Sequence, residues 1–118
     1  MDTDKDVAVV VRRPPLGSLK GTEALRMALG QSTTNRVTLI LVEVGVWLAA
    51  SLKPDVVEGG EIGKHLDMLL RLKQRVWVEA ESLDRFGLGA LALGAGIQVV
   101  SRQEIDRELL AADAVVVF

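Results

Sequence analysis

Five short apolar runs predict the strands of a sheet. β-branched residues are common in these runs, which is typical of strands. The runs are apolar at consecutive positions rather than at alternating ones. They therefore indicate strands that are buried on both faces, as in a parallel sheet. The runs are Val7 to Val11, Val37 to Val42, Val76 to Val78, Ile97 to Val100 and Ala114 to Phe118.

Segments with helical features separate these runs. Apolar residues on one face, or a capping pattern such as the S-x-x-E pair Ser101 and Glu104, mark each of them. The alternation of strands and helices predicts one α/β domain over residues 1–118. We expect a three-layer α/β/α sandwich around a five-stranded, mostly parallel sheet, flavodoxin-like in general architecture. The predicted helices cover about 19–30, 46–52 and 62–73, one begins at 82–86, and the last follows Ser101.

The composition adds information about partners. Hydrophobic residues make up 49% of the 118 residues, which is a high share for a small domain. Either the sheet is buried on both faces, or another chain covers some apolar residues. The net charge is −2 with mixed signs, so we expect no direct nucleic-acid partner and no membrane partner. The apolar window 37–52 is too short to span a bilayer, and the acidic start MDTDKD is unlike a signal peptide. We therefore expect a cytoplasmic protein.

Cysteine is absent from the chain, and His65 is its one histidine. Thiolate nucleophiles, persulfide carriers and cysteine metal sites are therefore excluded within this chain. No HExxH-like spacing is present, which argues against a zinc site. No metal and no cofactor are expected. Ser18 and Ser82 lack a paired histidine. No catalytic constellation is recognisable, no residue is assigned a catalytic role, and the sequence leans away from an enzyme.

Polar residues and glycines follow the first three predicted strands. Because parallel strands share a direction, these loops meet along one edge of the sheet, where ligands usually bind. Such residues could form a polar cleft or ion-pair network, or only a solvated rim of loops. The most notable is Glu79, an acid at the end of a core strand. The candidate pocket comprises Arg12, Arg13, Gly17 and Ser18, then Glu43 and Gly45, then Glu79 and Ser82.

Two apolar stretches are candidate contacts with another subunit. Residues 88–95 carry no charge, and the candidates there are Leu88, Leu91 and Leu93. Trp47 lies on the short apolar helix, and buried aromatic residues often dominate interfaces. Each has an alternative, because residues 88–95 could cap the core locally and Trp47 could pack within it.

Four segments resemble the small DsrE/DsrF-like proteins, and most closely the DsrF/TusC branch of sulfur-relay subunits. The resemblance covers nearly the whole chain and rests on the order and spacing of the segments. It implies a five-stranded parallel sheet in an α/β/α sandwich, and cytoplasmic sulfur handling within hetero-oligomers. The segments are PPLGSLKGTEALRMAL (14–29), LVEVGVWLAASLKP (41–54), VWVEAESLDRFGL (76–88) and ELLAADAVVVF (108–118).

The chain departs from this family at one position. Active members carry a cysteine after the third strand, and the matching position here is Glu79. A carboxylate cannot carry a persulfide, so the resemblance implies a non-catalytic subunit or scaffold. Its partners would be related small α/β subunits in a homo- or hetero-oligomer. The alternative is a small-anion-binding protein or enzyme that uses Arg12, Arg13, Glu43 and Glu79.

Overall fold

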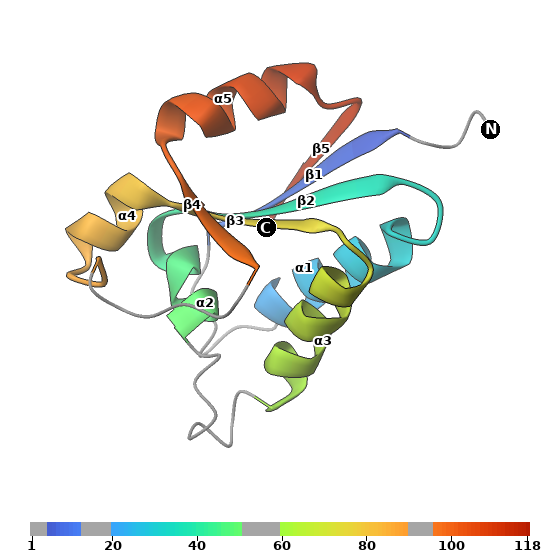
Figure 1. Cartoon of the computed structure of the whole chain (residues 1–118), viewed down its shortest axis with the longest axis horizontal. Helices are drawn as coiled ribbons and strands as arrows, with labels where there is room; N and C mark the ends of the chain where they lie inside the picture. Colours follow the sequence, from blue (N-terminus) through green and yellow to red (C-terminus); the bar gives the residue numbers. More distant parts are fainter. Residues whose placement is uncertain (1–4, 13–19, 51–59, 90–95) are drawn as a thin grey trace.

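The strands form one five-stranded sheet in which every neighbouring pair is parallel. The structure is a computed structural model, and it describes residues 5–12, 20–50, 60–89 and 96–118. The strand order is β4-β3-β2-β1-β5 (Figure 1). The predicted strands are confirmed to within one residue at each end. Their bounds are β1 Asp6–Val11, β2 Arg36–Leu41, β3 Arg75–Glu79, β4 Ile97–Val100 and β5 Ala114–Val117.

Helices connect the strands close to where the sequence predicts them. Two helices begin two residues before their predicted starts. Helix α3 begins at Gly60, and α4 begins at Ala80, directly after Glu79. The turn before α2 is a 3₁₀ segment, η1. In the described ranges, no helix combines the length and apolarity needed to cross a membrane. The bounds are α1 Lys20–Gln31, η1 Glu43–Val46, α2 Trp47–Ala50, α3 Gly60–Arg71, α4 Ala80–Arg85 and α5 Arg102–Ala111.

The strand order decides which helices cover which face of the sheet. From β1 to β4 the chain moves across the sheet in one direction, and from β4 to β5 it returns past β1. Right-handed crossovers place the connections of the outward steps on one face and the return helix on the other. Accordingly α1 and α3 lie on one side of the sheet in Figure 1, and α5 lies alone on the opposite side.

The face under α1 and α3, here called the closed face, is an aliphatic core. The side chains of Val9, Leu39 and Val78 point to this face, and each is fully buried. Leu25 of α1 and Leu69 of α3 pack against them. Consecutive strands thus bury one continuous layer of branched side chains, which is the main favourable term in the stability of such a domain.

The face under α5, here called the open face, is smaller and partly polar. Val10, Ile40 and Trp77 are buried there against Ile105 of α5. The indole N–H of Trp77 donates a 3.0 Å hydrogen bond to the Gln98 amide oxygen. The guanidinium of Arg75 lies 4.7 Å from the Trp77 ring centre and also pairs with Glu108 of α5. Polar contacts therefore help to hold α5 on this face.

The two edge strands are less buried than a sheet covered on both faces would require. In β4 only Val100 is buried, and in β5 no residue is. Among the described residues, each edge strand has a neighbour on one side only, and α5 is the one helix that covers the open face. The helices lie on both faces as predicted, but their coverage is unequal.

Candidate functional site

The site lies where two neighbouring strands send the chain to opposite faces. After β3 the chain enters α4, whose Leu83 joins the core of the closed face. After β4 it enters α5, whose Ile105 joins the core of the open face. Since β3 and β4 are adjacent, their diverging exits leave a crevice at the carboxyl ends of the strands. Open α/β sheets bind ligands at such switch points.

Glu79 is the last residue of β3 and lies inside this crevice. It pairs in register with Val100 and alternates with Val78, so its side chain points to the open face. The residue is only 4% exposed. Its carboxylate accepts hydrogen bonds from the Ser82 hydroxyl, from Arg102 Nε at 3.3 Å and from Arg102 Nη2 at 3.5 Å. A buried carboxylate requires such partners, because burial without them is costly.

A chain of hydrogen bonds extends from Glu79 to the loop after β2. Ser82 Oγ donates to Glu79 and accepts from the backbone N–H of Glu43 at 2.7 Å. Glu43 has a positive φ of 52°, a conformation that is strained for a residue other than glycine. The hydrogen bond from its N–H helps to hold that conformation. Glu79 and Ser82 therefore fix the relative positions of β2, β3 and α4.

The N-terminus of α5 is joined to the same crevice. The Arg102 backbone N–H donates to both carboxylate oxygens of Glu81, at 3.0 and 3.1 Å. The Ser101 hydroxyl accepts from the Glu104 N–H, as the capping pattern predicts. A negative side chain at a helix N-terminus is favourable. The hydrogen bond to Glu79 raises the pKa of the Arg102 guanidinium most, and the negative charges nearby raise it further. The guanidinium is therefore a permanent cation.

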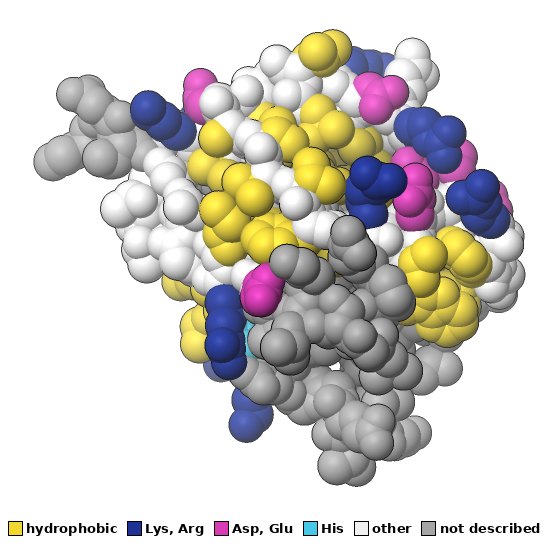
Figure 2. Space-filling model, turned by 180° about the vertical axis from the view of Figure 1, so that it is seen from behind, with side chains coloured by type: hydrophobic (Ala, Val, Ile, Leu, Met, Phe, Trp, Pro, Cys, Tyr) yellow, Lys and Arg dark blue, Asp and Glu magenta, His cyan; other side chains and the backbone are white. Residues whose placement is uncertain are grey.

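An open cleft of about 460 Å³ adjoins the crevice on the open face. Figure 2 shows this side of the molecule, with hydrophobic side chains in the middle and basic and acidic ones gathered beside them. The polar rim comes from the loops and helix ends at the carboxyl edge, and the apolar floor from β1, β5 and α5. The lining residues are Val10, Arg12, Val42, Glu43, Glu79, Arg85, Arg102, Ile105, Asp106, Leu109, Val115 and Val117.

The residues predicted for the pocket separate into three groups. Arg12, Glu43 and Glu79 do line one cleft, and Arg12 Nε lies 3.6 Å from Glu43 Oε2. Ser82 is buried behind the rim, where its hydroxyl contacts the Glu79 carboxylate and the backbone N–H of Glu43. Gly45 has a packing role, since a Cβ there would collide with the carbonyl of Val11, 2.7 Å from its carbon. Predicted pocket residues Arg13, Gly17 and Ser18 lie outside the described residues.

Sequence reasoning missed three charged cleft residues: Arg85, Arg102 and Asp106. Arg102 and Asp106 follow the fourth predicted strand, whose loop reaches the same edge as the first three. The S-x-x-E pattern at Ser101 could have pointed to them, because it places a helix start at that edge. Arg85 is at the end of α4, and only the packing of that helix brings it to the rim.

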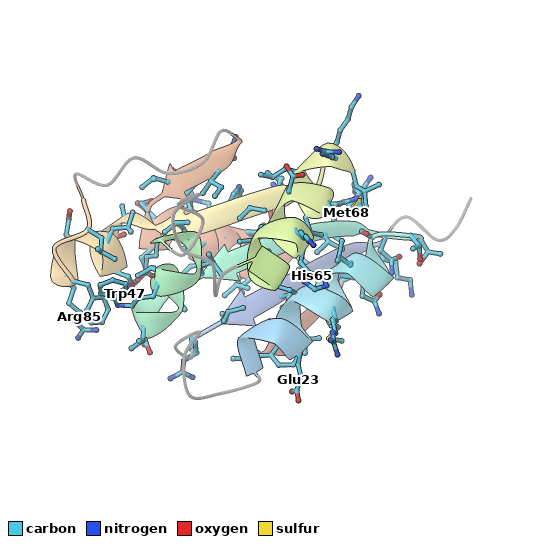
Figure 3. All side chains as sticks on the ribbon, turned by 90° about the horizontal axis from the view of Figure 1, so that it is seen from below. Glu23, Trp47, His65, Met68 and Arg85 are labelled. Carbon is cyan, nitrogen blue, oxygen red and sulfur yellow. The ribbon has the colours of Figure 1, made fainter. Side chains whose placement is uncertain are left out.

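The candidate interface residues have different environments in the structure. Trp47 of α2 is 39% exposed, so it is not a core residue. Figure 3 shows Trp47 and Arg85 at the same end of the molecule, with His65 away from it on α3. Leu88 is partly buried against the core of the closed face, which is the local-capping alternative. The other two candidates, Leu91 and Leu93, lie outside the described residues.

The chemistry that this arrangement supports is charge recognition. Both oxygens of Glu79 are engaged, and the hydroxyl of Ser82 is held between two partners. In the part of the chain that the structure describes, no three His, Asp or Glu residues are grouped to hold a metal ion. The guanidinium groups of Arg12, Arg85 and Arg102 are the groups best suited to contact a ligand.

Comparison with known families decides the kinship of the chain. The model of the DsrE/DsrF-like family matches residues 5–118. The chain belongs to the DsrE/DsrF-like family. The family match covers all five strands and the candidate site.

A solved structure supports the fold. The crystal structure of the ychN protein from E. coli superimposes with a TM-score of 0.80 at 24% sequence identity. The similarity covers 97% of this chain and 99% of that chain. At this identity the likeness concerns the fold alone. Comparison with curated proteins gave no match.

Proposed function

We propose that this chain is a non-catalytic DsrE/DsrF-like subunit or scaffold, of the DsrF/TusC type, in a cytoplasmic sulfur-relay complex. The proposal rests on one observation, which is that residue 79 is a glutamate. In the resemblance to the family, residue 79 matches the position where active members have their sulfur-carrying cysteine, and the chain has no cysteine elsewhere. A persulfide requires a thiol, so any sulfur carried in the complex must reside on a partner.

The contacts of Glu79 support a structural role for this position. The carboxylate is buried, and both of its oxygens accept hydrogen bonds from Ser82 or Arg102. A general base must have an oxygen available to the proton that it removes. The site therefore favours holding β3, α4 and α5 together over catalysing a reaction.

Exposed apolar side chains supply surfaces for a partner. Trp47 is 39% exposed, and tryptophan is enriched among residues that dominate interfaces. It lies at the same end of the molecule as the candidate site (Figure 3). We infer that the partner, a related small α/β subunit that carries a cysteine, contacts the molecule at this end.

The proposal is tested by isolating the chain from its native host with a mild affinity tag and weighing the intact complexes by native mass spectrometry. We expect a complex with a related subunit that contains cysteine. Trp47→Ala should reduce recovery of that subunit. Met68→Ala is the matched control, because Met68 is also exposed, at 49%, but lies on α3.

Two results would contradict the proposal. The first is a monomer with no co-purifying subunit at about micromolar concentration, where a stable complex stays assembled. The second is a complex whose other subunits also lack cysteine. Equal recovery with Trp47→Ala and Met68→Ala would leave the complex intact but place its interface elsewhere.

A further inference from the structure

The floor of the cleft is aliphatic and only partly covered. Val115 and Val117 are 43% and 54% exposed, although they pair with Ala8 and Val10 in the middle of the open face. Among the described residues that line the cleft, none is aromatic. Such a floor suits a flexible hydrocarbon chain, whereas planar rings are usually held by stacking on aromatic side chains.

The rim of the cleft has unused hydrogen-bond donors. Each guanidinium has five N–H groups, and Arg12 approaches Glu43 with its Nε at 3.6 Å. Both side chains of that pair are about half exposed, so the pair is weak. Arg102 uses Nε and Nη2 on Glu79. Arg85 also lines the cleft, and within the described part of the chain its side chain forms no hydrogen bond or ion pair.

Three carboxylates share the rim with the three guanidinium groups, and two of them are already paired. Both oxygens of Glu79 are engaged, and Glu43 faces Arg12. Asp106 is the carboxylate that remains, and its charge also contributes to the raised pKa of Arg102. Donors therefore exceed acceptors, which favours a ligand with an anionic head group. The planar fork of arginine matches a carboxylate.

The place and size of the cleft agree with a ligand site. It opens beside the switch point between β3 and β4, at the carboxyl edge of the sheet. Its volume of about 460 Å³ lies within the range of small-molecule sites. Charged side chains lie beside the apolar area in Figure 2, so one elongated molecule can contact both.

We propose that this cleft binds the anion of a short aliphatic carboxylic acid. Its carboxylate contacts Arg85 and Arg12, and its hydrocarbon chain lies over Val115 and Val117. This inference does not depend on the proposed function, since a scaffold subunit and an isolated protein would bind the ligand equally. A native mass measurement tests the scaffold, and the titration below tests only the cleft.

The test is an NMR titration of the isotope-labelled full chain with hexanoate at neutral pH. We expect amide shifts that cluster at β5 and α5, with a dissociation constant of roughly 1 mM. Hexylammonium has the same chain and the opposite charge, and it should not produce these shifts. Arg85→Gln should weaken hexanoate binding about tenfold, since a charged hydrogen bond is lost. Arg107→Gln, on α5 but outside the cleft, should leave binding unchanged.

A second variant keeps the proposal testable if Arg85→Gln fails to fold. Asp106→Asn removes the remaining carboxylate, so hexanoate should bind more tightly to it. The proposal is overturned if hexanoate gives no shifts, or if hexylammonium gives the same ones. It is also overturned if neither variant changes the affinity, or if the shifts follow protein concentration rather than hexanoate, as they would if a second copy covered the floor.

Discussion

The side chains of β1 enter two different environments. Val7, Val9 and Val11 lie beneath α1 and α3, in a core built of aliphatic groups. Ala8 and Val10 lie beneath α5, next to Trp77 with its polar partners. One strand thus contributes to two cores. Apolar contacts stabilise the first, and hydrogen bonds help to stabilise the second.

This contrast between the two faces shows where the fold has room for function. On the closed face the sheet and its helices leave little space, so a change there acts on stability. On the open face one helix covers the sheet, and Val117 at its edge remains 54% exposed. The cleft lies on this face. Variants on each face can test this contrast.

The strongest test of close packing is Gly45→Ala. A Cβ at Gly45 would collide with the backbone carbonyl of Val11, which no side-chain rotation can relieve. We expect a loss of about 4 kcal/mol in unfolding free energy or no folded protein. Urea denaturation measures it. Gly30→Ala is the control, because the space around Gly30 is open and alanine favours its helix, so the control should be neutral or stabilising.

A direct comparison of the two faces uses Leu69→Ala and Val117→Ala. Leu69 of α3 is fully buried in the core of the closed face, so its truncation leaves a cavity and should lower the unfolding free energy by about 3 kcal/mol. Val117 is half exposed, and its truncation should change stability by under about 0.5 kcal/mol. Similar losses for both variants would mean that the open face is covered in solution.

The junction between the two faces is tested by Glu79→Gln. The amide keeps the shape of the side chain but loses the charge-assisted hydrogen bonds, so we expect a loss of about 2 kcal/mol in unfolding free energy. Glu104→Gln is the control, because Glu104 is exposed in the first turn of α5. If the two variants had the same midpoint in urea, the buried network would contribute nothing measurable.

The smallest effect concerns Asp6, at the opposite end of the sheet from the cleft. The hydrogen bond from Arg36 Nε, 2.7 Å long, lowers the pKa of the Asp6 carboxyl below its ordinary value. A lowered folded-state pKa adds stability above the unfolded-state pKa, and this is lost as the pH falls through the folded-state value. Because the pair is exposed, Asp6→Asn should lower stability by about 0.5 kcal/mol at neutral pH.

The pH dependence separates this effect from a general loss of structure. The difference between wild type and Asp6→Asn should shrink in acid and vanish once Asp6 is protonated in both states. Thermal unfolding of both proteins across the acid range measures it. A difference that persists unchanged at low pH would show that the Asp6 carboxylate is not its source.

Much of the fold could be predicted because its information is local. The consecutive apolar residues of Val7 to Val11 predict a buried strand without knowledge of its neighbours, and β1 has nearly the same bounds. The pair Ser101 and Glu104 predicts a helix start, and the hydroxyl of Ser101 does accept from the Glu104 N–H. The residues that follow the strands could also be assigned to one edge, because parallel strands share a direction.

The exposure of the closing strand could not be predicted in this way. The residues AVVVF read like another buried strand. Their surroundings depend on strand order, which places β5 at the edge beside β1. No local pattern carries that information, because it follows from the direction in which each crossover turns.

Three features follow from the amino-acid sequence without the fold: the alternation of strands and helices, the absence of thiol chemistry and the acid at the end of the third strand. What that acid contacts depends on the packed sheet. Arg102 follows Glu79 by 23 positions, and the pairing of β3 with β4 brings their side chains together. Backbone preferences act between near neighbours along the chain, whereas a site is formed by residues that only the packed sheet makes neighbours in space.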